Sequence, residues 1–259
     1  MNTPKNERRY PGNPNDPEHR KWVGRDWDLL GAHQFNVLTS LGLRDSHYLL
    51  DIGCGSLRGG RFLMSYLLPG HYFAIEPEKW AVESGIKDEV GQNFIDLKSP
   101  SFDYNNSGNL SIFDKKFDYI IAHSVFIHSD KNFIENCIKE AKKVLKPDGI
   151  FAANFFFSNL DSKEAGWNYP DSRRYQKDTI RKIVRDVGLK MEILPWKHPH
   201  GPAHTWVVIT HPNSVAITKK YFNTDLKYNY NLFTAIACEV RSVIKNYLSI
   251  FFKKIGKNK

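Results

Sequence analysis

Apolar runs typical of strands alternate along the chain with apolar residues at helical spacing. The strand-like runs cover residues 47–53, 71–77, 101–106, 117–124 and 149–157. Helical spacing precedes the first run and separates later ones, over residues 26–41, 58–68, 79–90 and 132–145. A parallel crossover needs about a dozen residues, usually a helix, and parallel strands are apolar because both faces are buried. The pattern therefore predicts an α/β domain with a mostly parallel sheet and helices on both faces.

The last two predicted strands break this rhythm. After a helix that begins near residues 178–179, residues 189–196 and 204–211 are both strand-like. Only about seven residues, rich in proline, glycine and histidine, separate them. That separation is too short for a parallel crossover. We therefore expect an antiparallel hairpin at the end of the sheet.

The two ends of the chain differ in composition from this domain. Residues 1–25 contain four prolines and predict an irregular arm, residues 26–212 form the predicted domain, and residues 213–259 form a tail. The formal charge of +9 divides into +2 for residues 1–212 and +7 for the tail. A near-neutral domain argues against a nucleic-acid partner.

The tail contains one amphipathic stretch, residues 229–255. Its apolar residues have helical spacing, and Arg241, Lys245, Lys253 and Lys254 supply positive charge. A basic amphipathic helix of this kind suits peripheral contact with an anionic membrane. Docking of the helix on the domain, or on a second copy in a homodimer, explains the apolar stripe equally well.

The cysteines and the first residues indicate a cytoplasmic protein. Cys54, Cys137 and Cys238 are far apart and odd in number, which predicts neither a disulfide framework nor a metal site. The first residues are polar and proline-broken, unlike a signal peptide, and no apolar run approaches the roughly 20 residues that span a bilayer. The inner face of the membrane is the alternative location if the tail binds lipid.

Residues 49–62, at and after the first predicted strand, contain several residues that are typical of a ligand-binding loop. Gly53 and Gly55 permit a tight turn and a close approach of the backbone to a ligand. The dinucleotide fingerprint GxGxxG fails, because Arg58 stands where its third glycine belongs. Asp51 would repel a pyrophosphate but suits a ligand that carries an ammonium group. These residues disfavour a nicotinamide-dependent oxidoreductase.

Four segments share the form of one enzyme family: Asp51-Ile-Gly-Cys-Gly55, Ala-Ile-Glu76-Pro, Phe117-Asp-Tyr-Ile-Ile and Val144-Leu-Lys-Pro-Asp-Gly149. With them the chain resembles, over roughly residues 25–212, a class I S-adenosylmethionine-dependent methyltransferase. The resemblance implies a Rossmann-like fold, a seven-stranded sheet with a terminal antiparallel hairpin, and S-adenosylmethionine as cofactor. Leu57 stands where a third glycine usually falls, which leaves the path of the loop open.

The resemblance also implies which residues contact the cofactor. Gly53 and Gly55 would pass beneath its methionine part, Asp51 would reach its amino group, and Glu76 would accept both ribose hydroxyls. The end of the third strand would face the adenine, where we favour Asn106 over Asn105. The full expected set is Asp51, Gly53, Cys54, Gly55, Glu76, Asn106, His123 and Ser124.

The methyl acceptor requires a base if it is a hydroxyl. His128, just beyond the fourth strand, is the candidate general base, and a packing or hydrogen-bonding role is the alternative. Residues 158–176 form a long loop, and Trp167, Tyr169 and Tyr175 are its candidate acceptor walls unless it is only a surface loop. His200 in residues 198–204 is a further candidate, since this stretch suits a polar hairpin loop better than a metal site.

These observations favour an enzyme that O-methylates a small molecule or a sugar or glycan precursor. The loop GCGSLRGG and the IEP that follows resemble those of bacterial methyltransferases of surface-glycan and secondary-metabolite pathways. An N-methyltransferase, or a lipid or natural-product methyltransferase of the same fold, is the alternative within the class. A binding protein that keeps the fold without turnover is the alternative outside it.

Overall fold

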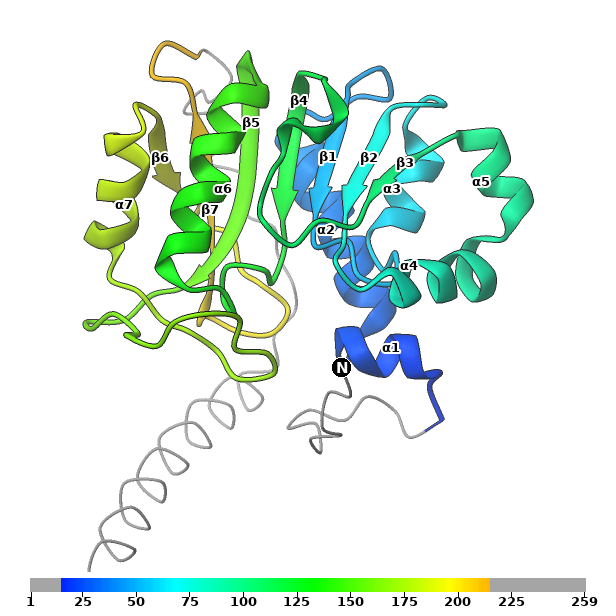
Figure 1. The fold of residues 1–259 in the computed structure, drawn as a ribbon, viewed down its shortest axis with the longest axis horizontal. Helices are drawn as coiled ribbons and strands as arrows, with labels where there is room; N and C mark the ends of the chain where they lie inside the picture. The colour runs from blue at the N-terminus through cyan, green and yellow to red at the C-terminus, as the bar shows by residue number, and fades with distance from the viewer. Residues whose placement is uncertain (1–14, 215–259) are drawn as a thin grey trace, which may run out of the picture.

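The computed structural model describes residues 15–214, which form a seven-stranded sheet with helices on both faces (Figure 1). The strand order is β3-β2-β1-β4-β5-β7-β6. The strands are β1 Leu49–Ile52, β2 Tyr72–Ile75, β3 Ser101–Asp103, β4 Phe117–Ala122, β5 Leu145–Phe156, β6 Lys190–Ile193 and β7 His204–Thr210. The helices are α1 Glu18–Val23, α2 Trp27–Ser40, α3 Gly60–Tyr66, α4 Lys79–Gly85, α5 Gln92–Lys98, α6 Lys131–Val144 and α7 Lys177–Asp186. A π-helical turn, Ile86–Val90, and a 3-10 turn, Ser111–Phe113, complete the elements.

The strand pairing confirms the fold class predicted from the sequence. Strands β1 to β5 pair in parallel, whereas β7 pairs antiparallel with both β5 and β6. The hairpin that the short 197–203 connection required is therefore present, with β7 inserted between β5 and β6. Strand β5 begins at Leu145, earlier than expected, and its pairing with β4 shifts register between Phe117 and Tyr119.

Two helices depart from the sequence-based expectation. Helix α1 lies within the 1–25 segment that was expected to be irregular, because Pro17 occupies the N-cap, where its missing N–H leaves the helix intact. Helix α5 fills the connection between the π-helical turn and β3, where no element was predicted. It has no buried residue, so its apolar pattern is weak.

The sheet separates two apolar cores. On one face, α6 and α7 pack against the sheet through Ile138, Ala141 and Ile180. On the other face, α2, α3 and α4 contribute Val37, Leu63 and Val82. Strands β1, β2 and β4 are buried on nearly every residue because both of their faces are covered.

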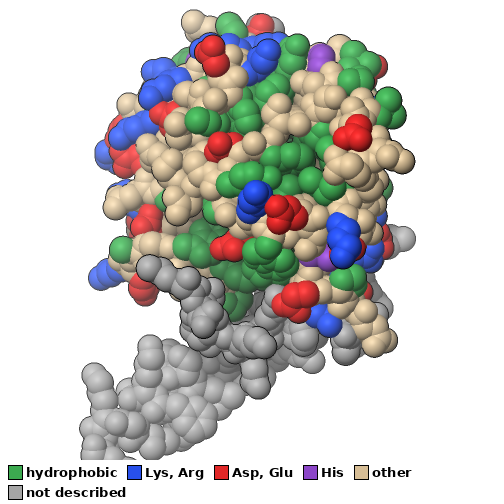
Figure 2. All heavy atoms as spheres, turned by 45° about the vertical axis from the view of Figure 1, so that its right-hand side comes forward, with side chains coloured by type: hydrophobic (Ala, Val, Ile, Leu, Met, Phe, Trp, Pro, Cys, Tyr) green, Lys and Arg blue, Asp and Glu red, His purple; other side chains and the backbone are tan. Residues whose placement is uncertain are grey.

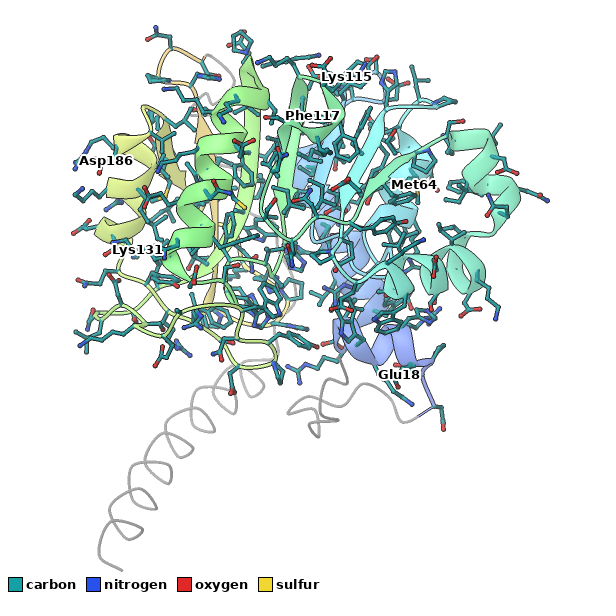
Figure 3. All side chains as sticks on the ribbon, in the orientation of Figure 1. Glu18, Met64, Lys115, Phe117, Lys131 and Asp186 are labelled. Atoms are coloured by element: carbon teal, nitrogen blue, oxygen red, sulfur yellow. The ribbon has the colours of Figure 1, made fainter. Side chains whose placement is uncertain are left out.

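The register aligns the carboxyl ends of the central strands. Ile52 pairs with both Ile75 and Ala122, and Ala122 pairs with Ala153. Gly53, Glu76, His123 and Asn154 therefore follow at one edge of the sheet. Helix α1 and the loop 158–176 lie at this edge, and Figure 3 labels Lys115 and Phe117 at the opposite edge.

Acidic and basic side chains are mixed over the face in Figure 2, consistent with the small net charge of the domain. Within residues 15–214, no helix combines the length and apolar character needed to cross a membrane. The amphipathic stretch 229–255 and residues 1–14 of the predicted arm lie outside the described residues.

Candidate functional site

The loop after β1 brings its backbone against side chains that leave no room for a Cβ. Gly53 and Gly55 have φ values of +69° and +57°. A Cβ would lie 2.5 Å from Val125 Cγ2 at Gly53 and 2.7 Å from Val23 Cγ1 at Gly55. Leu57, where a third glycine was missing, adopts φ 65° and is fully buried. The loop therefore keeps a left-handed residue at this position, a conformation that usually favours glycine.

Glu76 follows β2 and lies against the same loop. Its Oε2 accepts a hydrogen bond from the Gly55 N–H at 2.9 Å, and Oε1 accepts one from the Glu78 N–H at 3.0 Å. Burial raises the pKa of Glu76 to about 7, while these two N–H groups act in the opposite direction. Each oxygen keeps acceptor capacity, which suits a ligand with hydroxyl groups.

Asp51 in β1 is held by a tyrosine from the neighbouring strand. The Tyr72 hydroxyl donates to Asp51 Oδ2 at 2.7 Å, and both residues are buried. Burial raises the pKa of Asp51 to about 6, while the Tyr72 hydrogen bond and the charge of Arg58 lower it. Sequence reasoning missed Tyr72, since a tyrosine in a buried strand gives no signal of a polar role.

The end of β3 forms a compact polar loop. Asn105 Oδ1 accepts hydrogen bonds from the Ser107 and Asn109 N–H groups, and its Nδ2 donates to Asp103 Oδ1. Asn106 is exposed beside this loop. Asn105 is thus occupied in shaping the loop, whereas the amide of Asn106 is accessible.

His123 and Ser124 follow β4 and are supported by Asn154 from β5. Ser124 adopts φ 62°, and its N–H donates to Asn154 Oδ1 at 2.6 Å. Asn154 Nδ2 lies 2.9 Å from His204 Nδ1. Since Oδ1 accepts, Nδ2 donates, and His204 Nδ1 is unprotonated. Sequence reasoning missed Asn154, although a lone amide inside the apolar run of β5 is a detectable signal.

Five histidines gather beside this strand end: His33, His123, His198, His200 and His204. The His200 backbone N–H donates to His198 Nδ1 at 3.0 Å. A neutral His198 therefore carries its proton on Nε2 and donates it to His123 Nε2, 2.9 Å away. The proton of His123 is then on Nδ1, a buried atom without a hydrogen-bond partner.

Burial keeps this cluster neutral. It lowers the pKa of His33 to about 3 and of His200 to about 4, and it lowers the pKa values of the other three well below the ordinary range. His200, a candidate acceptor residue, lies with Nε2 2.9 Å from Asp26 Oδ2. Over residues 15–214, no group of three or more His, Cys, Asp or Glu side chains is arranged to hold a metal ion.

His128 has one ring nitrogen engaged and the other available as an acceptor. Its Nδ1 is 2.7 Å from the Asp171 carbonyl, which only accepts, so Nδ1 carries the proton and Nε2 does not. Burial lowers the pKa of His128, and the Asp171 carbonyl opposes that shift. The ring lies 5.5 Å from Trp167 and 5.0 Å from Tyr169, measured between centroids.

The loop 158–176 is ordered around a buried arginine. Arg173 Nη1 donates to the Glu164 carbonyl, and Nη2 donates to the Ala165 and Gly166 carbonyls. Sequence reasoning missed Arg173, since an arginine in a polar loop predicts an exposed side chain.

The aromatic residues of this loop separate into two groups. Trp167 and Tyr169 are 59% and 36% exposed, and both rings lie beside His128. Tyr175 is instead 1% exposed, belongs to the core and donates its hydroxyl proton to the Ser129 carbonyl. We therefore exclude Tyr175 from the acceptor walls.

Helix α1 covers the glycine loop and meets the loop 158–176. Ser56 Oγ donates to the His19 carbonyl at 3.0 Å, and the Tyr169 hydroxyl donates to the Trp22 carbonyl. The Trp22 ring packs 5.4 Å from Trp80, measured between centroids. Trp22 therefore lies beside Tyr169 at the border of the site.

The residues of this site suit a ligand that carries hydroxyl and ammonium groups. Acceptors are supplied by Glu76 and Asp51, the two glycines give close backbone approach, and His123 Nδ1 and Arg58 Nε are buried donors without partners. An orphaned buried donor is costly unless a ligand or water engages it. The residues expected from the sequence to contact the cofactor at the ends of β1, β2 and β4 thus lie at one edge of the sheet. Their donors and acceptors are of the kinds that S-adenosylmethionine would need.

Residues 50–153 match the family model described as a methyltransferase domain. Three solved structures share the fold over most of the described chain. The glycopeptide N-methyltransferase MtfA complexed with S-adenosylmethionine superposes with a TM-score of 0.55 at 14% identity, over 70% of this chain and 94% of its own. The Synechocystis magnesium protoporphyrin IX methyltransferase with bound S-adenosylhomocysteine gives 0.51 at 14%, over 71% and 84%.

An S-adenosylmethionine-dependent methyltransferase from Clostridium acetobutylicum gives a TM-score of 0.51 at 13% identity, over 76% of this chain and 93% of its own. At these identities the solved structures define a shared fold. The family model matches residues 50–153, which run from β1 into β5. This segment contains the glycine loop, Glu76 and the end of β4.

Proposed function

We propose that this chain, which carries a class I S-adenosylmethionine-dependent methyltransferase domain, O-methylates a small molecule or a sugar or glycan precursor. The cofactor, when bound, supplies an activated methyl group. The protein has to align the acceptor oxygen and remove its proton. The proposal assigns these two tasks to the aromatic border of the site and to His128.

His128 provides the observation that carries the proposal. Its Nδ1–H is fixed by the Asp171 carbonyl at 2.7 Å, so the unprotonated Nε2 is the nitrogen that can accept a proton. His128 Nε2 would take the acceptor O–H proton while the new oxygen–methyl bond replaces the sulfur–methyl bond of the cofactor, which would leave as S-adenosylhomocysteine. The proton would then pass to solvent. Partial burial favours the neutral ring, which is the form a base requires.

Trp167 and Tyr169 support an acceptor on the solvent side of His128. Both rings border His128, and Tyr169 is fixed through its hydroxyl to the Trp22 carbonyl. Aromatic faces suit the apolar faces of sugars and of aromatic small molecules. In the proposal these rings orient the acceptor, and Asp51, Gly53, Cys54, Gly55, Glu76, Asn106, His123 and Ser124 hold the cofactor.

The test is methyl transfer from isotope-labelled S-adenosylmethionine to a panel of hydroxyl and amine acceptors, nucleotide sugars included, with products identified by mass spectrometry. His128→Gln should lower kcat about a hundredfold or more and leave S-adenosylhomocysteine affinity unchanged. His211→Gln, at the opposite edge of the sheet, is the control. Products methylated only on nitrogen would overturn the O-methylation proposal and favour the N-methyltransferase alternative. An unchanged kcat in His128→Gln would exclude His128 as the base.

Two alternatives stand for the stretch 229–255. It binds an anionic membrane, or it docks on the domain or on a second copy of the chain. Sedimentation with anionic vesicles, compared between the full chain and a chain that ends at residue 228, distinguishes them. Loss of co-sedimentation on truncation supports the membrane. Loss of a dimer in equilibrium sedimentation supports a second copy.

A further inference from the structure

Arg58, which precedes α3, is a buried arginine with most of its donors unused. It is 7% exposed, and Nη1 donates to the Val23 carbonyl at 3.0 Å. Its Nε is buried without a partner. Among residues 15–214, no carboxylate forms an ion pair with this guanidinium. The side chain therefore places a positive charge in the protein interior without a contacting counter-charge.

Arg173 shows how this protein satisfies a buried arginine when the role is structural. It is 2% exposed, and both of its Nη atoms donate to loop carbonyls. Nη1 also lies 3.2 Å from the Glu164 carboxylate. Arg58 has neither the second engaged Nη nor the carboxylate. Both arginines leave Nε without a partner, so they differ in Nη2 and in the carboxylate. The protein supplies partners of both kinds to Arg173 and neither to Arg58.

The surroundings of Arg58 place it within the functional site. Burial lowers its pKa to about 10, and the acidic groups of Tyr169, Asp26 and Asp51 act in the opposite direction. Its charge in turn contributes to the lowered pKa of His123. Asp51 in β1, Tyr169 in the loop 158–176 and His123 after β4 belong to segments proposed to contact the cofactor or the acceptor, and Asp26 precedes α2.

A buried charge is strongly destabilising unless a counter-charge and hydrogen bonds compensate it. The guanidinium is planar and offers pairs of parallel donors, a geometry that matches a carboxylate or a phosphate. A ligand with such a group would engage the free Nη2 and Nε of Arg58. It would also neutralise the charge that no described residue contacts.

We propose that Arg58 binds an oxyanion of a ligand in this site, a carboxylate or a phosphate. The inference rests on the proposed function for the identity of the ligands. Two sources have this chemistry: the amino-acid carboxylate of the cofactor, with Asp51 beside it for the ammonium group, and an anionic group on the methyl acceptor. Arg58 is in either case a binding residue that sequence reasoning noted only for breaking the dinucleotide fingerprint.

The first experiment compares S-adenosylmethionine with its decarboxylated form, which lacks only the carboxylate, by calorimetric titration. The proteins are the full chain, Arg58→Gln and the control Arg61→Gln, which removes a partly exposed arginine paired with Asp28. If the cofactor is the source, Arg58→Gln weakens S-adenosylmethionine binding about tenfold or more and changes the affinity of the decarboxylated form less than twofold. Equal weakening of both ligands would overturn the proposal, because Arg58 would then act only on the loop.

The second experiment uses sodium phosphate and sodium acetate as probes on protein saturated with S-adenosylhomocysteine. If the acceptor is the source, each anion raises the Tm of the full chain, and Arg58→Gln abolishes that rise while keeping the cofactor affinity. Wild-type behaviour of Arg58→Gln in both experiments overturns the proposal.

Two further outcomes are a variant that does not fold and a full chain that does not bind the cofactor. If Arg58→Gln does not fold, Arg58→Lys replaces it; retention of the charge without the planar fork should give an intermediate loss, and no loss overturns the proposal. If the full chain binds neither cofactor form, the methyltransferase assignment fails, and the anion titration without cofactor decides the role of Arg58 alone.

Discussion

The Nε2 atoms of His123 and His198 lie 2.9 Å apart in the interior, joined by a single proton. The His200 backbone N–H fixes the direction of that hydrogen bond by occupying His198 Nδ1. The orphaned Nδ1–H of His123 follows from this direction. A second proton between the two rings would replace a hydrogen bond with a repulsion, so the arrangement requires that both histidines stay neutral.

This requirement predicts that the protein loses stability in mild acid. For a histidine whose folded pKa is below its unfolded value, the unfolded chain takes up protons first, so stability present above pH 6.5 is lost as pH falls. His33, with a folded pKa of about 3, alone contributes a loss of about 2 kcal/mol between pH 7 and pH 5. Urea unfolding followed by tryptophan fluorescence at both pH values measures the effect.

Two buried carboxyl groups act in the opposite sense. The folded pKa values of Asp51 and Glu76 are raised to about 6 and about 7, so the folded state takes up these protons first and gains stability as pH falls. Five lowered histidines outweigh two raised carboxyls, and the net change is destabilising. A free energy of unfolding that is equal or larger at pH 5 would contradict this balance.

Glu76 should control cofactor affinity and its pH dependence. Because an ionised carboxylate is the stronger acceptor for hydroxyls, S-adenosylmethionine affinity of the full chain should fall as pH decreases through about 7. Glu76→Gln should weaken binding at pH 8 about tenfold or more and remove that pH dependence. Calorimetric titration between pH 6 and pH 8 measures both effects, with Glu78→Gln as the neighbouring control. A Glu76→Gln variant that binds as tightly as the full chain would exclude this carboxylate from the cofactor site.

Asn154 should be a structural support of the β4 end. Asn154→Ala leaves the Ser124 N–H and His204 Nδ1 without their partner and should cost roughly 1–3 kcal/mol of unfolding free energy. Asn154→Asp keeps the acceptor for the Ser124 N–H but requires a proton on His204 Nδ1. The unfolding free energy of this variant, relative to that of the unsubstituted protein, should therefore increase as pH falls. Chemical denaturation measures both variants, with the exposed Asn136→Ala as control. A cost in Asn136→Ala as large as that in Asn154→Ala would show that neither effect depends on burial.

Helix α1 should loosen when its anchor to Glu89 is removed. Arg20 Nε and Nη2 lie 2.6 and 2.7 Å from the two Glu89 oxygens, and His19 Nε2 lies 2.7 Å from Oε1. Glu89→Gln should raise amide exchange in α1 about tenfold and weaken cofactor binding severalfold, because α1 covers Gly55. Hydrogen exchange read by mass spectrometry tests this.

The control for that experiment is Glu83→Gln, which removes an exposed i,i+4 pair with Lys79. Exposed pairs of this kind contribute little to stability. Unchanged α1 exchange in Glu89→Gln would show that apolar packing, rather than the buried ion pair, holds the helix on the loop.

The fold was predictable because it depends on periodicities that neighbouring residues express. The apolar runs that became β1, β2 and β4 and the short 197–203 connection determine a parallel sheet with an antiparallel end. Exposed α5 and the short α1 were not predicted, since neither has a long apolar stripe.

Some residues of the candidate site were predictable from the sequence and others were not. Gly53, Gly55 and Glu76 stand next to strands, so parallel register alone brings them to one edge. Tyr175 shows the limit of this reasoning: its loop position suggested an acceptor wall, and packing placed it in the core.

The sequence by itself therefore determined that the polar residues and glycines that follow the parallel strands lie at one edge of the sheet. Only the tertiary structure decided which polar groups complete one another. Tyr72 with Asp51 and Asn154 with Ser124 are pairings between segments far apart in the sequence. Arg58 has the Val23 carbonyl as a partner for Nη1 but none for its buried Nε, and only the positions of the surrounding acceptors in space show this.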